Sequence, residues 1–216
     1  MKESTNILMN EDYKKELSRK IFHVITIMIL PVLYMFVSKG QILSIVIPAS
    51  ILIILADFYR HRVNFVGKIF HAVFGHILRE KEFEEDSWTG ATYSAVAALF
   101  VFILCPKIIA ICAFSILAVS DCLAALVGKG VSSREFFEKS MSGSIAFGVS
   151  AFVILLICGY TTNQGFGFYL FGTFAVFVTT ILEARPSLFD MDDNLTIPVS
   201  FAAIMLFFGM VWNLNY

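Results

Sequence analysis

Residues 118–147 read AVSDCLAALVGKGVSSREFFEKSMSGSIAF, and this stretch sets the architecture of the whole chain. It joins two apolar runs through a short polar loop, and it places an acid, Asp121, inside the first run. Apolar runs of this kind are typical of membrane-spanning helices. A carboxylate within such a helix costs roughly 3 kcal/mol on membrane-insertion scales. We therefore expect a membrane protein in which the charges of this stretch serve a function.

The composition extends this interpretation to the full chain. Of its 216 residues, 58% are hydrophobic and 23 are Phe, and the mean hydropathy is +0.79, whereas soluble domains are only about half apolar. We expect an all-α, polytopic membrane protein that forms a single domain over residues 1–216, with residues 1–18 as a polar cytoplasmic segment. Seven membrane spans are predicted, at 21–37, 42–56, 89–104, 108–127, 143–160, 167–182 and 197–211.

The segment 57–88 is too polar to cross the bilayer. Apolar residues recur there at helical spacing over 66–78, which predicts an amphipathic helix lying in the membrane interface. The distribution of Lys and Arg predicts the orientation, because with a cytoplasmic N-terminus the opposite side receives only Lys39 and Lys107. Every cluster of unusual polar residues then lies at the cytoplasmic face, as in an enzyme that uses a soluble co-substrate.

Asp121 and the run KSMSGS at 139–144 are the two polar features of the central stretch. Asp121 is followed by small residues at helical spacing, Ala124 and Gly128 among them. This pattern suits either a helix-packing groove or a site where a carboxylate holds a metal ion or accepts a proton. The run at 139–144 stands where the next helix begins, and helix N-termini bind phosphate. The alternative is that this run is only a basic segment at the membrane edge in which a Ser caps the next helix.

Two further polar clusters precede the central stretch. One side of the first span carries Arg19, Lys20 and His23. A basic segment at the membrane edge explains Arg19 and Lys20 better than it explains His23. Asp57 ends the second span, with Arg60 three residues later. This pair is either a local ion pair or a contact to a metal ion or nucleotide.

An acidic cluster follows the sixth span. Glu183 and the loop 185–194, which is rich in Asp, suggest Mg²⁺ beside a phosphate site, with a solvated loop and Asn capping as the alternative. The four cysteines lack metal-ligand spacing and are expected to be small buried hydrophobic residues. Soluble nucleotide-binding motifs are absent, and nothing supports nucleic-acid binding. No feature predicts an oligomeric state.

The polar clusters form an ordered set of motifs. They are Arg19-Lys20-x-x-His23, Asp57-x-x-Arg60, Arg79-x-x-Glu82, Asp121-x-x-Ala124-x-x-x-Gly128, Lys139-Ser140-x-x-Gly143-Ser144 and Asp193-Asn194-Leu195-x-Ile197-Pro198. This set resembles the CTP-dependent lipid-alcohol kinases, the family of phytol kinase, dolichol kinase and yeast-type diacylglycerol kinase. The chain departs from the family pattern at Ser120, where Gly is usual, and at Gly130, which follows Gly128 too early.

The resemblance implies a kinase that transfers the γ-phosphate of CTP to a membrane lipid alcohol. The catalytic residues would be Asp121, Lys139 and His23. The nucleotide would be held by Arg19, Lys20, Arg79, Gly128, Ser140, Gly143, Ser144 and Asn194. The Mg²⁺ ligands would be Asp121, Asp57, Glu183 and Asp193.

Two alternative functions remain open. Phosphatidate cytidylyltransferases share a related Asp and Lys signature, so that synthesis of CDP-diacylglycerol is the nearest enzymatic alternative. A non-enzymatic transporter is the second alternative. Transport sites lie near the bilayer midplane, whereas the outer halves of these spans are nearly free of ionisable groups, which favours chemistry at one face.

Overall fold

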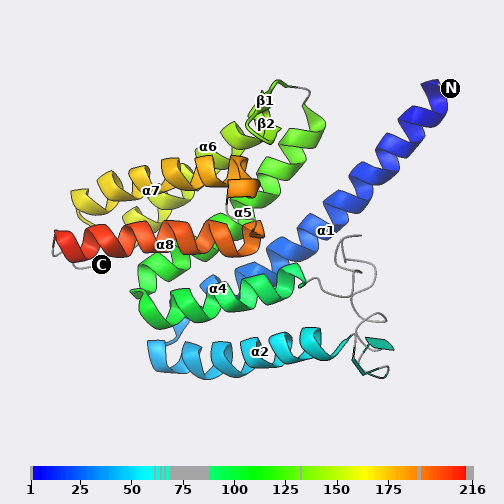
Figure 1. Ribbon diagram of the computed structural model, residues 1–216. Coiled ribbons are helices and arrows are strands. Elements are labelled where there is room, and N and C mark those ends of the chain that lie inside the picture. The colour runs from blue at the N-terminus through cyan, green and yellow to red at the C-terminus, as the bar shows by residue number, and fades with distance from the viewer. Residues whose placement is uncertain are drawn as a thin grey trace.

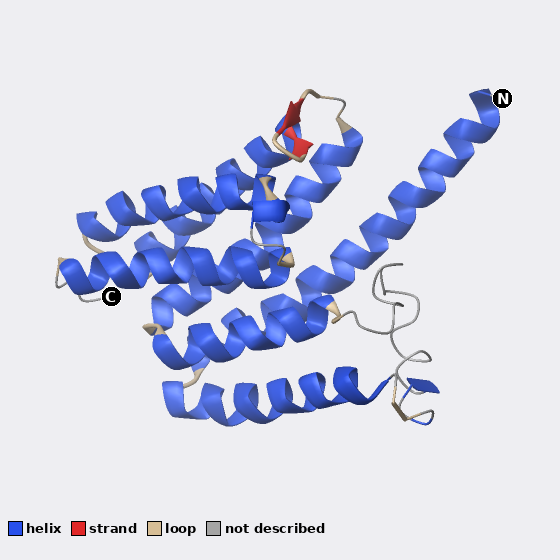
Figure 2. Cartoon of the chain, in the orientation of Figure 1, coloured by secondary structure: helices blue, strands red, loops and turns tan. Residues whose placement is uncertain are grey.

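The structure is a computed structural model that describes residues 2–60, 62–63, 65, 67–68, 88–131, 133–188 and 191–212, with side chains from residue 17 onward. Apart from one small hairpin, the described chain is helical (Figures 1 and 2). The helices are α1 (Lys2–Phe36), α2 (Lys39–Arg60), α4 (Gly90–Leu104), α5 (Lys107–Gly130), α6 (Met141–Thr161), α7 (Phe166–Ala184) and α8 (Asp193–Val211). Strands β1 (Glu135–Phe136) and β2 (Lys139–Ser140) form the hairpin, and a 3₁₀ helix, η2 (Pro186–Leu188), follows α7. The prediction of an all-α polytopic membrane protein is confirmed.

Six of the seven predicted spans are long and apolar enough, within the described residues, to cross a membrane. The exception is α4, whose 15 residues extend about 22 Å at 1.5 Å per residue, less than the roughly 30 Å of hydrocarbon. Thr89 caps its first turn, and Pro106 follows its end by two residues. The predicted amphipathic helix at 66–78 falls almost entirely outside the described residues.

The central element of the bundle is α5. All of its residues from 108 to 118 are buried, because the helix is apolar around its whole circumference. Helices α1, α6, α8 and, to a smaller extent, α4 pack against it, while α7 packs on α6 and α8 and α2 packs on α4. The cysteines are buried and free, as predicted.

Successive helices alternate in direction (Figure 1). The N-terminal ends of α4, α6 and α8 therefore gather with the C-terminal ends of α2, α5 and α7 at one end of the bundle, which we call the site end. Helix α1 enters the bundle at this end and extends beyond it toward the N-terminus.

The opposite end carries the two lysines that the charge distribution assigned to it. Lys107 Nζ donates to the carbonyl oxygens of Met35 and Val37 at 3.2 and 3.0 Å. Lys39 Nζ donates to the carbonyl oxygen of Cys105 at 3.2 Å. Both ammonium groups thus stabilise carbonyl groups at helix C-terminal ends.

Candidate active site

Asp121 lies near the site end of α5 and is 6% exposed. Lys20 of α1 is 4% exposed, and its Nζ lies 2.5 Å from Asp121 Oδ2. His23, one turn further along α1, places Nε2 3.8 Å from the same oxygen. A buried charge that has a partner is far less costly than an isolated one. The structure therefore brings three of the predicted site residues together and gives the membrane-embedded acid a counter-ion.

Lys139 forms a second buried ion cluster. Its Nζ lies 2.5 Å from Glu183 Oε1 and 2.9 Å from Asp193 Oδ2. Burial disfavours the charged form of Lys139, but the carboxylates of Asp193 and Glu183 more than offset this effect and raise the pKa of Lys139 above its ordinary value. Asp121 interacts electrostatically with all three groups of this cluster. The two ion clusters therefore form one charged region at the site end.

The β1–β2 hairpin holds Lys139 in this position. In its turn, the Glu138 amide donates to the carbonyl oxygen of Ala184 at 3.1 Å. The Glu138 carboxylate accepts hydrogen bonds from the amide and the hydroxyl of Ser187. The hairpin is thus fastened to the end of α7, next to Glu183. This position leaves the ammonium group of Lys139 in contact with both Glu183 and Asp193.

Gly128 and Gly143 stand where α5 and α6 approach closely. A Cβ atom on Gly143 would lie 2.8 Å from the carbonyl oxygen of Ala124, and one on Gly128 would lie 2.5 Å from Ser140 Oγ. Ser140 also caps α6, with its Oγ accepting from the Gly143 amide at 3.2 Å. Three predicted nucleotide-binding residues therefore pack or cap helices. Ser144 is buried, and within the described residues its hydroxyl has no hydrogen-bond partner.

Asp57 fastens α2 to the first turn of α4. Its Oδ2 accepts from the Thr89 amide at 2.8 Å and from the hydroxyls of Thr89 and Thr92 at 2.9 and 2.6 Å. Its Oδ1 lies 2.9 Å from Arg60 Nε. This predicted metal ligand is thus surrounded by partners on α2 and α4, and none of these is shared with the Lys139 cluster as far as the structure describes it.

Asn194 lies at the start of α8 and is buried. Its amide and its side-chain Nδ2 both donate to Asp192 Oδ1, at 2.9 and 2.6 Å, so that Asp192 caps the helix and orients Asn194. The predicted nucleotide contact Arg79, together with Glu82, lies outside the described residues.

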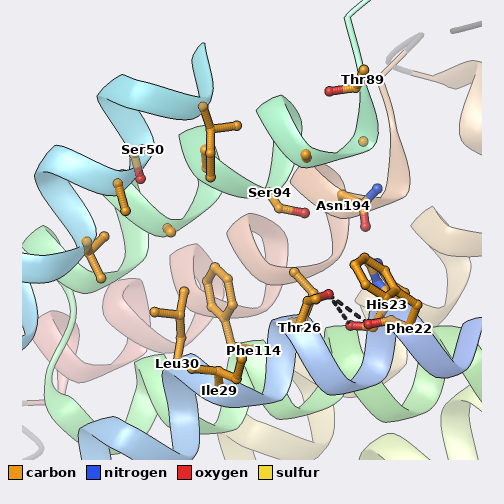
Figure 3. Close-up of a pocket in the computed structure, with 18 of the residues that line it drawn as sticks. Phe22, His23, Thr26, Ile29, Leu30, Ser50, Thr89, Ser94, Phe114 and Asn194 are labelled. Atoms are coloured by element: carbon orange, nitrogen blue, oxygen red, sulfur yellow. Dashed lines mark hydrogen bonds between the residues drawn. The ribbon is translucent and has the colours of Figure 1, made fainter. Parts of the chain in front are cut away.

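A cavity of about 430 Å³ lies between α1, α2 and α4 and reaches the site end (Figure 3). Along α2, its lining runs from Val46 to Ala56, about 15 Å at the helical rise, or half of the hydrocarbon thickness. The polar end is formed mainly by Arg19, Lys20, His23, Asp121 and Asn194, and the apolar part mainly by Ile29, Leu30, Val46, Ala95, Ala98 and Phe114. The cavity is therefore an apolar space with a charged mouth.

Aromatic rings close the inner end of this cavity. The ring of Phe114, which lines the cavity, lies 5.1 Å from the ring of Phe102, and Phe102 lies 5.3 Å from Tyr34. All three side chains are fully buried. We call this group the aromatic floor; it separates the cavity from the opposite end of the bundle.

Comparison with known proteins finds a similar protein in Rickettsia prowazekii (strain Madrid E). It is 31% identical over 195 residues to "Uncharacterized protein RP860", and the match covers 90% of this chain and 95% of that protein. The chain belongs to the RP860 family. No family model matches the sequence, and no solved structure matches it.

Of the four predicted Mg²⁺ ligands in this RP860-family protein, Glu183 and Asp193 fit the ion best. Their second oxygens, Glu183 Oε2 and Asp193 Oδ1, are buried and have no hydrogen-bond partner among the described residues. Magnesium is commonly held by one or two carboxylates together with substrate phosphates. The described chain contains no group of three or more His, Cys, Asp or Glu side chains suited to a metal ion. The donor set therefore fits a cation shared with a phosphate.

The prediction from sequence missed the cavity of this RP860-family protein. A signal was present, because one face of α4 carries small residues at helical spacing. The members of this face that line the cavity are Gly90, Ala91, Ser94, Ala95 and Ala98. It also missed the contact between Glu138 and Ser187, for which no local pattern exists, because the two residues lie 49 positions apart.

Proposed function

We propose that this protein transfers the γ-phosphate of CTP to the hydroxyl of a membrane lipid alcohol at the cytoplasmic face. The observation that best supports this function is that His23 and Asp121 line the charged mouth of a cavity whose inner part is mainly apolar. A lipid alcohol has the matching form, with one hydroxyl on a hydrocarbon chain. CTP as donor is supported by the ordered motifs, and the cytoplasmic orientation by the distribution of Lys and Arg.

In the proposed reaction, the lipid hydroxyl attacks the γ-phosphorus. The new O–P bond forms as the bond from the γ-phosphorus to the β–γ bridging oxygen breaks, and CDP leaves. His23 Nε2 accepts the hydroxyl proton, and Asp121, 3.8 Å away, stabilises the resulting imidazolium.

The cationic side chains neutralise the charge that develops on the phosphates. Phosphoryl transfer depends mainly on positioning and on such electrostatic stabilisation. Lys139, Lys20 and Arg19 lie at the site end and supply positive charge. Glu183 and Asp193 would hold Mg²⁺, which supplies further neutralisation of the triphosphate when bound.

A double-label assay tests this proposal. Purified protein is incubated with CTP labelled at either the α- or the γ-phosphate and with phytol, geranylgeraniol, a polyprenol, diacylglycerol or phosphatidate. We expect the γ-label to enter an alcohol and the α-label to enter no lipid. Incorporation of the α-label with phosphatidate would instead identify a cytidylyltransferase, and a protein that labels no lipid would not be the proposed kinase.

A further inference from the structure

We propose that the cavity between α1, α2 and α4 holds a single hydrocarbon chain of the acceptor lipid, about one leaflet long, and that Ala98 and Phe114 limit the length of that chain. This inference rests on the proposed function. It narrows the acceptor from lipid alcohols in general to alcohols that carry one chain.

The cavity is open to the bilayer between α1 and α2. Phe22 and Ile29 on α1 and Ile53 on α2 line the cavity, yet they are 40%, 57% and 38% exposed. Helix α1 packs mainly on α5, whereas α2 packs mainly on α4, so these two helices are not closed against each other. A chain in the surrounding leaflet can therefore enter sideways without passing through water.

The volume of the cavity suits one chain rather than two. A cavity of about 150 Å³ binds one benzene ring, so by proportion about 430 Å³ has room for about 17 carbon atoms. The cavity also extends about 15 Å along α2, which is about half of the hydrocarbon thickness. Both measures describe one chain that fills one leaflet; the two chains of a diacylglycerol exceed the volume.

Ala98 and Phe114 stand at the inner end. Ala98 is the deepest residue of α4 that lines the cavity, and Phe114 is part of the aromatic floor. Because packed protein interiors have low compressibility, a hydrocarbon chain whose end reaches the aromatic floor cannot extend further into the bundle. Helix α1 lines the cavity from Leu30 at the inner end to Arg19 at the mouth, about 16 Å along the helix. A chain of about 15 Å that rests on the floor therefore leaves its hydroxyl at the mouth, which His23 also lines.

Binding of alcohols to the full-length protein in detergent, without nucleotide, tests the inference. Native mass spectrometry would measure the occupancy of geranylgeraniol, of the shorter farnesol and of dioleoylglycerol. We expect Ala98→Leu, which shortens the cavity, to weaken geranylgeraniol binding at least tenfold and farnesol binding less than threefold. The matched control is Val96→Leu, because Val96 lies on the same helix, is 40% exposed and does not line the cavity; it should change neither.

The outcomes separate this inference from the proposed function. Three outcomes would overturn the single-chain cavity even in a protein that phosphorylates lipids. They are an equal loss of binding of both alcohols in Ala98→Leu, no loss of binding of either alcohol, and binding of dioleoylglycerol as tight as that of geranylgeraniol. The expected binding pattern in a protein that transfers no phosphate would support the cavity and reject the kinase.

Discussion

Asp121 combines a structural role with the chemical role that we propose for it. Its carboxylate is buried and paired with Lys20, so that its charge stabilises the contact between α1 and α5. The same carboxylate lies near His23 at the mouth of the cavity, where the proposed reaction takes place. Removing one charge disturbs both roles, whereas removing both members of the pair disturbs chiefly the chemistry.

A double-mutant cycle separates these roles. Asp121→Asn leaves the Lys20 ammonium buried without its partner, and Lys20→Met leaves the carboxylate, so each change should destabilise the protein by about 3–5 kcal/mol. The double variant should recover most of this stability but none of the lipid phosphorylation. Thermal unfolding in detergent and the γ-label assay measure the two effects. Full activity in Asp121→Asn would remove this residue from the proposed mechanism.

His23 is the residue that we expect to accept the proton from the lipid hydroxyl. Its side chain is only partly buried, so His23→Gln should change the melting temperature little while it lowers kcat by about 10²–10⁴-fold. Ser18→Ala, at an exposed position one turn away, is the control and should retain the rate. Steady-state kinetics with a lipid alcohol check this, and a His23→Gln variant with the wild-type kcat would contradict the role.

The β1–β2 hairpin joins α7 and α8 through Lys139. Because the pKa of Lys139 is raised, its contribution to stability is fully present below the pKa of the unfolded chain and is lost only as the pH rises through the higher folded value. The wild-type protein should therefore lose no stability through this group between about pH 6 and pH 9.

Replacing Lys139 should produce a different pH dependence. Lys139→Met leaves the carboxylates of Glu183 and Asp193 buried side by side, at a cost of about 3 kcal/mol or more at neutral pH. Lowering the pH toward 5 should protonate one carboxylate and recover part of the melting temperature. Lys129→Met, at an exposed position, should change stability by less than about 1 kcal/mol. A Lys139→Met protein as stable as wild type at pH 8 would argue against the cluster.

The close packing of α5 against α6 depends on glycine, which has no side chain at the point of contact. Gly143→Ala would bring a Cβ atom within 2.8 Å of a backbone carbonyl, which can retreat only if the two helices separate, so we expect a loss of about 1–3 kcal/mol. At Gly130, a Cβ atom would meet nothing within 4 Å, and Gly130→Ala should be neutral or stabilising by up to about 1 kcal/mol. Thermal unfolding of both variants tests the contrast, and equal melting temperatures would contradict it.

The alternating helices present their two ends to different sides of the membrane. In a variant without native cysteines, Ser133→Cys places a thiol at the site end, and Asn163→Cys places one at the opposite end. If the N-terminus is cytoplasmic as proposed, an impermeant thiol reagent should label Asn163→Cys in intact cells and Ser133→Cys only after permeabilisation. The reverse labelling pattern would place the site on the outer face.

The sequence predicts the elements of this fold better than their contacts. Apolar length is a local property, so the spans were identified, but Glu183 and Asp193 proved to be helical because helices continue beyond the hydrocarbon. Among the described residues, the charged clusters gather at one end of the bundle, as expected, whereas the position of the cluster at 79–85 and the side of the membrane stay predictions. Their pairing was not predictable, because Lys20 and Asp121 are 101 residues apart. For the same reason, the partners of Asp57 on α4 could not be foreseen.

We expect the aromatic floor to have an electrical consequence for the cell. The charged clusters of the site end lie on one side of the floor, and the floor itself consists of the packed, fully buried rings of Tyr34, Phe102 and Phe114. A membrane potential acts on any charge that can move through the bilayer. If the floor blocks the passage of ions, the bundle carries no current, and we expect a cell to hold many copies without discharging its ion gradients. Vesicles that contain the protein should keep an imposed potential as long as empty vesicles do.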